Sequence, residues 1–174
     1  IANDDQITTV ILAAEWSYYV YGRRHGSRQF IYRYEDSMNT NIDNNPQEFS
    51  AALASTIQLL HQSNKQIMFV EPLPEYTTRI PEAMAKIMWK GGDVASLQLP
   101  MPSYVDRNRD LFTFLSKLDS NQVHRIPVIE HFCDADQCRP YDEDLNPYYT
   151  DSNHLNEHGL SVISEPLLID VGVL

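Results

Sequence analysis

The sequence predicts an α/β protein with a largely parallel sheet, and two observations lead to this prediction. Short β-branched apolar runs, typical of buried strands, alternate along the chain with longer segments in which apolar residues recur at helical spacing. No internal repeat, low-complexity tract or linker interrupts this order. Because 174 residues suffice to bury one sizeable core, we expect a single domain over residues 1–174.

Three runs are predicted to be the strands of this sheet: residues 7–14, 65–70 and 125–130. The first is a continuous apolar and β-branched run, which indicates a strand buried on both faces. Pro127 in the third run indicates a strand at the edge of the sheet or the entry into one, because proline cannot donate to a hydrogen-bond ladder.

Four segments are predicted to be helices: residues 46–60, 80–90, 103–118 and about 157–170. In the first of them Pro46 suits the opening turn and four apolar residues recur at helical spacing. Pro166 is expected to kink or restart the last helix. The four apolar residues that recur in the first helix are Phe49, Leu53, Ile57 and Leu60.

Residues 16–34 are rich in tyrosine and arginine, which predicts either a solvated surface segment or a wall facing a substrate.

The composition excludes two classes of protein. A net charge of −11 and a pI of about 4.8 argue against a nucleic-acid partner, because phosphates require a basic surface. The apolar runs are much shorter than the roughly 20 residues that cross a bilayer. The chain begins at Ile1 without a methionine, which predicts a fragment or a processed product.

The strongest candidate site lies in residues 149–159, where Asp151 and His154 precede the last predicted helix. An aspartate can hold the Nδ1–H of a histidine in the same loop and so leave Nε2 free to take a proton from a serine hydroxyl. The pair therefore predicts the orienting half of a nucleophilic triad. Because the loop enters a helix, it is expected at the edge of the sheet where the strands end.

Cys133 and Cys138 permit three interpretations: free buried thiols, a small disulfide loop, or metal ligands. Together with His154 and His158 they match the spacing of zinc sites with two cysteines and two histidines. However, the segment 133–158 contains seven Asp or Glu residues and one Arg, so it is not a DNA-reading finger. A structural zinc site stays as a weaker alternative.

The run Tyr149-Thr-Asp151-Ser-Asn-His154-Leu-Asn-Glu-His-Gly159 resembles the last block of SGNH (GDSL-type) hydrolases. It is most similar to the version found in SGNH domains fused to membrane acyltransferase-3 proteins, which O-acetylate bacterial surface polysaccharides. The strand-like residues 9–19, which lead into Trp16, resemble the third block of that group. Residues 65–75 resemble the next strand and loop, and the cysteine pair before the terminal block is also typical.

The resemblance implies a three-layer α/β/α fold of the SGNH or flavodoxin-like type and a Ser-His-Asp mechanism of O-acetyl transfer. In that mechanism His154 acts as general base and then as general acid, and Asp151 orients it. It also implies a Cys133–Cys138 disulfide, a periplasmic or extracytoplasmic location and a glycan acceptor. No cofactor or metal is expected in the chain itself, because an N-terminal membrane domain of the parent protein would use the acetyl-CoA.

The chain departs from the family pattern at the nucleophile, because it has neither the Gly-Asp-Ser block nor the oxyanion glycine block. We therefore expect the serine upstream of Ile1 and interpret the chain as the C-terminal portion of an SGNH-like domain, incomplete at its N-terminus. Ser37, which follows Asp36 after a strand-like run, is the alternative nucleophile. A second functional class is a catalytically inert module that binds a glycan through the tyrosines of residues 18–34 or assembles with a membrane partner.

Overall fold

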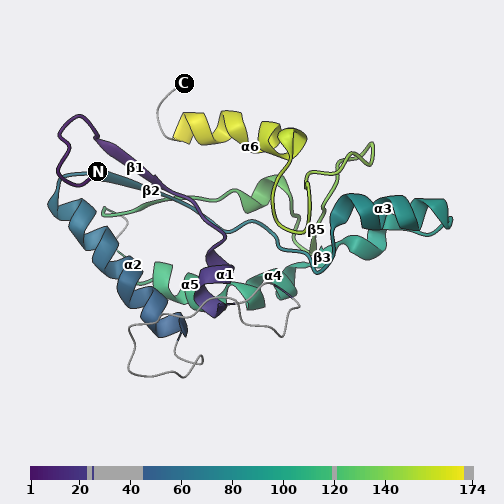
Figure 1. Ribbon diagram of the computed structural model, residues 1–174, viewed down its shortest axis with the longest axis horizontal. Coiled ribbons are helices and arrows are strands. Elements are labelled where there is room, and N and C mark those ends of the chain that lie inside the picture. The colour runs from purple at the N-terminus through teal and green to yellow at the C-terminus, as the bar shows by residue number, and fades with distance from the viewer. Residues whose placement is uncertain (23–24, 26–44, 119–120, 171–174) are drawn as a thin grey trace. The chain divides into compact units, whose positions relative to one another are not determined.

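The computed structural model describes residues 1–22, 25, 45–118 and 121–170 (Figure 1). The chain divides into two compact units, each built from two separate stretches of sequence. Unit 1 comprises Ile1–Pro72 and Asn108–Pro127, and unit 2 comprises Leu73–Arg107 and Val128–Leu174. The single domain expected over residues 1–174 stays a prediction.

Unit 1 contains a parallel sheet of three strands, which confirms the predicted α/β class. The strands are β1 (Thr9–Leu12), β2 (Gln66–Val70) and β4 (His124–Ile126), in the order β1-β2-β4. Both neighbouring pairs are parallel, with Val10 opposite Ile67 and Phe69 opposite Arg125. The first two strands are joined through helices, as parallel strands require.

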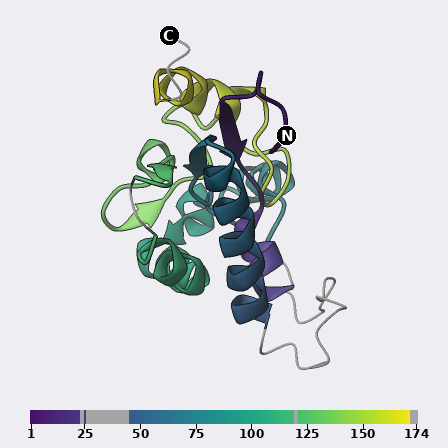
Figure 2. The same ribbon diagram turned by 90° about the vertical axis from the view of Figure 1, so that its left-hand side faces the viewer.

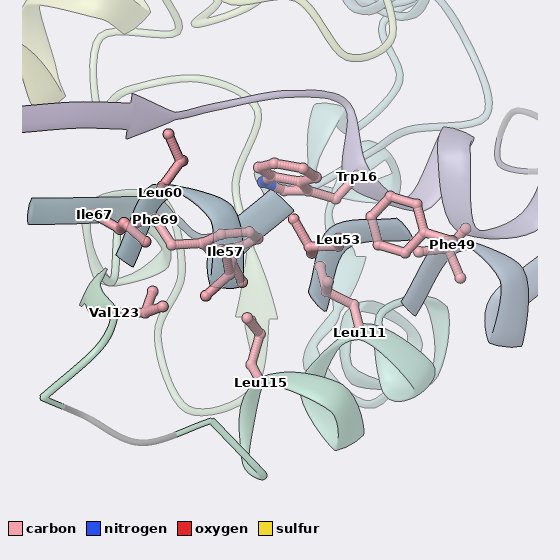
Figure 3. Packing of buried hydrophobic residues seen from close by; sticks show 11 residues of the cluster. Trp16, Phe49, Leu53, Ile57, Leu60, Ile67, Phe69, Leu111, Leu115 and Val123 are labelled. Atoms are coloured by element: carbon pink, nitrogen blue, oxygen red, sulfur yellow. The ribbon is translucent and has the colours of Figure 1, made fainter. Parts of the chain in front are cut away.

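The core of unit 1 lies between the sheet and three helices, α1 (Trp16–Tyr21), α2 (Asn45–Gln62) and α5 (Arg109–Leu115). Figures 1 and 2 show α2 running alongside the sheet. The apolar stripe predicted for this helix is the one that it buries, against Ile67 and Phe69 of β2 (Figure 3). Leu111 and Leu115 of α5 complete the cluster.

Trp16 corrects the sequence prediction for residues 16–34. It belongs to a helix, α1, and is buried rather than part of a solvated segment. Its ring stacks on Phe69 with the centroids 4.3 Å apart, and its Nε1–H donates to the Val70 carbonyl at 2.8 Å. Tryptophan fits this position because its one polar atom finds a partner at the end of β2. Most of residues 23–34 lie outside the described residues.

Two strand predictions are also corrected in detail. The strand β1 is not buried on both faces, because Ile11 is 48% exposed. The third strand covers only residues 124–126, and a 3₁₀ helix, η3 (Ile129–His131), follows it. Pro127 supplies no N–H to continue the ladder, so β4 ends directly before it, at an edge of the sheet.

Unit 2 holds the remaining elements around a second core. In chain order they are α3 (Ile80–Trp89), the 3₁₀ helix η2 (Val94–Leu97), β3 (Leu99–Pro100), α4 (Met101–Arg107), η3, β5 (Gln137–Cys138) and α6 (Glu157–Asp170). The two short strands pair antiparallel. The core residues are Tyr76, Ile80, Met84, Val94, Tyr141 and Tyr149.

The helix predicted over residues 103–118 is wrong in one respect, because it is two helices separated at Asn108. Asn108 is buried, and its Oδ1 accepts a short hydrogen bond from the hydroxyl of Ser17 at 2.5 Å. Its backbone leaves the helical region, with ψ of 9°, so α4 ends and α5 begins there. The last helix, α6, is continuous through Pro166, so of the two expected outcomes, a kink or a restart, the restart is wrong.

Candidate active site

Asp151 and His154 form the hydrogen-bonded pair that the sequence predicted. The Nδ1 atom of His154 lies 2.8 Å from Oδ2 of Asp151. The histidine side chain is 58% exposed, whereas that of Asp151 is 24% exposed. Within the part of the chain that the structure describes, the Nε2 atom of His154 has no hydrogen-bond partner. That atom is therefore accessible to a substrate or a nucleophile.

The other carboxylate oxygen of Asp151 accepts two backbone hydrogen bonds within the loop. Its Oδ1 accepts from the backbone N–H groups of Asn153 at 3.0 Å and of His154 at 2.9 Å. Burial alone would raise the pKa of Asp151, but these two N–H groups and the His154 ring outweigh it and lower the pKa to about 2. The aspartate is therefore an anion at neutral pH, and it fixes both the position and the orientation of the imidazole.

Two backbone hydrogen bonds attach segment 75–80 of unit 2 to the loop that carries Asp151 and His154. The backbone N–H of Tyr76 donates to the Ser152 carbonyl at 2.8 Å, and that of Ile80 donates to the Asp151 carbonyl at 3.1 Å. Glu75 begins this segment and is buried, and its Oε2 accepts from the Arg107 guanidinium at 3.0 and 3.1 Å. The loop that carries the Asp–His pair is thus attached to a segment that a buried ion pair secures.

The start of α6 fixes the other side of the loop. Asn156 caps the helix, because its Oδ1 accepts from the backbone N–H of Gly159 at 2.9 Å. Its Nδ2 donates to the Pro147 carbonyl at 2.7 Å, and its own N–H donates to the Tyr148 carbonyl at 2.9 Å. The asparagine therefore connects the segment before the loop to the helix after it.

A second histidine–aspartate pair lies at the first turn of α6. The Nε2 atom of His158 lies 2.9 Å from Oδ2 of Asp142, and the ring of Tyr148 stacks on the imidazole with centroids 5.3 Å apart. Here Nε2, the atom that is open in His154, is occupied by the aspartate. His158 thus links the 139–148 loop to the first turn of α6.

Cys133 and Cys138 form the predicted disulfide. Their sulfurs are therefore not available as thiolates, which excludes the zinc site built from these cysteines and His154 and His158. Elsewhere in the described residues, no group of three or more His, Cys, Asp or Glu side chains is arranged to hold a metal ion.

The described residues do not include Ser37, so the alternative nucleophile stays untested. The parallel sheet belongs to unit 1, and the loop with Asp151 and His154 belongs to unit 2. The placement of these two residues at the edge of the sheet therefore also stays a prediction. Sequence reasoning missed Asp142, which stands in an acidic run without a motif, and Arg107, the buried partner of Glu75. No described helix has the length and apolar character needed to cross a bilayer.

The chain is a member of a family of α/β domains with SGNH-type architecture. The family model "SGNH domain (fused to AT3 domains)" matches residues 1–168, so the chain belongs to that family, as its terminal block predicted. The fold is also similar to a solved structure, the periplasmic domain of the lipopolysaccharide acetyltransferase of Salmonella ser. Paratyphi A. The two share 15% sequence identity with a TM-score of 0.55, and the match covers 75% of this chain.

The chain spans about half of that neighbour, since the match covers 53% of the Salmonella domain. At this level of identity the likeness shows the fold alone. A comparison with curated proteins finds no match.

Proposed function

We propose that this chain supplies the aspartate and histidine of a Ser-His-Asp site that transfers an acetyl group to a hydroxyl of a bacterial surface polysaccharide. The observation that carries the proposal is the 2.8 Å contact between His154 Nδ1 and Asp151 Oδ2, with Nε2 open. A general base needs its orienting partner at about 2.6–3.2 Å, and the pair meets that requirement.

The reaction has two steps. His154 Nε2 takes the proton of a serine hydroxyl while the serine oxygen attacks the acetyl donor, and the protonated imidazole then gives the proton to the leaving group. In the second step Nε2 takes the proton of a sugar hydroxyl, the sugar oxygen attacks the acetyl-serine, and the serine leaves with that proton. Water in place of the sugar gives hydrolysis. Asp151 stays ionised and stabilises the imidazolium.

The serine and the oxyanion donors belong, in our proposal, to sequence upstream of Ile1, with Ser37 as the weaker alternative. A membrane acyltransferase domain of the parent protein would deliver the acetyl group from acetyl-CoA, so the chain itself needs no cofactor. Three findings support this arrangement: the family's fusion to AT3 domains, the likeness to a lipopolysaccharide acetyltransferase domain, and the Cys133–Cys138 disulfide, which suits an oxidising compartment such as the periplasm.

A cavity of about 260 Å³ in unit 2 supports a glycan acceptor. Asp142 and Tyr148 line it together with Arg139 and Glu143. Carboxylates and a guanidinium accept from and donate to sugar hydroxyls, and these polar groups lie on an open surface. The alternative of an inert glycan-binding module depends on the tyrosines of residues 18–34, of which the structure describes Tyr18, Tyr19 and Tyr21.

Replacement of His154 by alanine in the full-length parent protein tests the proposal. Acetyl transfer to the polysaccharide should decrease by at least about a thousandfold, because the serine loses its base. His61→Ala is the matched control, since His61 is an exposed histidine of α2 and should leave the rate unchanged. Undiminished transfer by the His154→Ala protein would contradict the assignment and favour the inert module.

A further inference from the structure

The C-terminal end of α3 exposes the largest apolar side chain of the described surface. Trp89 is 86% exposed and Met88 is 53% exposed. Ala85, three and four residues before them, lies on the same side of the helix and is also exposed. Ile80 and Met84 are buried in the core of unit 2, and Met88, four residues after Met84, lies at the edge of that buried side, whereas Trp89 lies opposite it. The exposed Ala85, Met88 and Trp89 thus form an apolar stripe that faces solvent.

A hydrogen-bonded motif closes the end of this helix. The N–H of Gly91 donates to the Met88 carbonyl at 3.0 Å, and the N–H of Gly92 donates to the Ile87 carbonyl at 2.9 Å. With Gly91 at φ of +68°, these bonds form a Schellman motif, which closes the helix and satisfies carbonyls that would otherwise need water. Trp89 therefore lies on a last turn in which the carbonyls of Ile87 and Met88 are already hydrogen-bonded.

Two lysines stand beside the stripe. Lys86 and Lys90 are both exposed and lie one turn apart. They form a local positive charge on a chain whose net charge is −11. The two lysines therefore mark this helix end as a place that an anionic surface can approach.

The size and composition of this helix end distinguish between two kinds of partner. A stable protein interface buries about 800 Å² on each side around a central apolar cluster. Here three apolar side chains end at Gly91, Gly92 and an exposed Asp93, so the patch is too small for such a core. A tryptophan flanked by lysines is the composition of segments that lie at the boundary between water and lipid, where the indole enters the headgroup region and the ammonium groups meet anionic lipids.

We propose that Trp89 and Met88, with Lys86 and Lys90, form a contact with the headgroup region of an anionic lipid bilayer. The contact is weak by itself, because it buries only two large apolar side chains. It becomes significant when the chain is held near a membrane, since tethering raises the effective concentration of the two surfaces. Only this tethering rests on the membrane domain of the proposed function. The contact itself does not depend on acyl transfer.

Fluorescence of the 174-residue chain tests the contact. Trp16 is buried in unit 1 and Trp89 is exposed, so a blue shift on binding reports on Trp89. The chain is held by an N-terminal hexahistidine tag on vesicles of phosphatidylcholine with a chelating lipid, with or without 30% phosphatidylglycerol. We expect a blue shift, and quenching by brominated acyl chains, on the vesicles that contain phosphatidylglycerol. Trp89→Ala should remove both signals.

The lipid-bound fraction of the tethered chain on the anionic vesicles, measured by the quenching of Trp89, tests the role of the lysines. Lys86→Gln with Lys90→Gln should weaken binding about 25-fold, since each lysine near an anionic surface contributes roughly a factor of five. Leu59→Ala is the matched control, because Leu59 is an exposed apolar residue of α2, 55% exposed, and this variant should bind like the native chain. Unchanged circular dichroism of each variant verifies that it is folded.

Two results would overturn the proposal. One is a tethered chain whose Trp89 emission and quenching do not respond to either vesicle. The other is self-association in light scattering that Trp89→Ala abolishes while lipid has no effect, which would assign the stripe to a protein contact between copies.

Discussion

The carbonyl oxygen of Tyr148 occupies the space that a Cβ atom at position 159 would need, so Gly159 is the residue that lets α6 begin where it does. The same carbonyl accepts the N–H of Asn156 at 2.9 Å, and the Asn156 side chain caps the helix by accepting the N–H of Gly159. The glycine that ends the sequence motif therefore has a steric role. It allows the helix to pack against the segment that leads into the Asp151–His154 loop.

Gly159→Ala should lower the free energy of unfolding by about 2–3 kcal/mol, because a backbone atom cannot move aside as a side chain can. Gly92→Ala is the control, since the atom nearest to its new Cβ is the Cγ2 methyl of Ile87, at 3.1 Å, and not a backbone atom. Urea unfolding of both variants measures the difference. Equal losses in the two proteins would show that the contact with Tyr148 relaxes at little cost.

The ionisation of Asp151 should be visible in a pH titration. Its pKa is about 2 in the folded chain and 3.8 ordinarily, so the folded state binds this proton less readily than the unfolded state. The stabilisation is therefore complete above about pH 4 and is lost as the pH falls towards 2. Carbon-13 NMR of the carboxylate should give a midpoint near 2. In the His154→Ala protein the midpoint should increase but stay below 3.8, because two backbone N–H bonds remain.

The matching unfolding experiment compares the native chain with Asp151→Asn from pH 6 to pH 2. The two stability curves should converge at the acidic end. Parallel curves over the whole range would mean that the carboxylate has no lowered pKa.

The two histidine–aspartate pairs should have different roles, one in catalysis and one in stability. His154→Gln should abolish acetyl transfer by the parent protein. His158→Gln should change the rate by less than about tenfold, because Nε2 of His158 is already bound to Asp142. The second substitution should instead destabilise unit 2, since it removes the link between the 139–148 loop and α6. Comparison of kcat with the thermal midpoint distinguishes the two roles, and a loss of kcat as severe as that of His154→Gln would assign His158 to the reaction.

The buried ion pair of unit 2 should contribute more to stability than the exposed one. Arg107 and Glu75 are 11% and 8% exposed, so Arg107→Met leaves a buried carboxylate without this partner and should cost about 3–5 kcal/mol. Arg79→Gln is the control, since Arg79 and Glu82 are 64% and 58% exposed and water replaces their contact. Denaturant titration measures both. Similar small effects would mean that water reaches Glu75 once the arginine is removed.

The regular elements could be predicted because their signals are local. The stripe of Phe49, Leu53, Ile57 and Leu60 has the period of a helix and is buried as expected. The Asp151–His154 pair could also be predicted, since four consecutive residues in one loop bring both side chains within reach of each other.

The features that were missed depend on residues far apart in sequence. The buried Trp16 donates to the Val70 carbonyl, and Asn108, at which α4 and α5 are separated, accepts from the hydroxyl of Ser17, 91 positions away. The contact of Asp142 with His158 joins residues that are 16 positions apart in the chain. No window of neighbouring residues carries these signals, because each depends on the folded arrangement.

The division of each unit into two stretches of sequence affects the order in which the chain can fold during synthesis. Residues 73–107 of unit 2 emerge before residues 108–127, which unit 1 needs for α5 and β4. The nascent chain therefore carries the first stretch of unit 2 without its second stretch while unit 1 is completed. Asp151 and His154 then emerge in the last stretch, after the segment 75–80 that secures their loop. The Asp151–His154 pair therefore forms late, against segment 75–80, which is synthesised earlier.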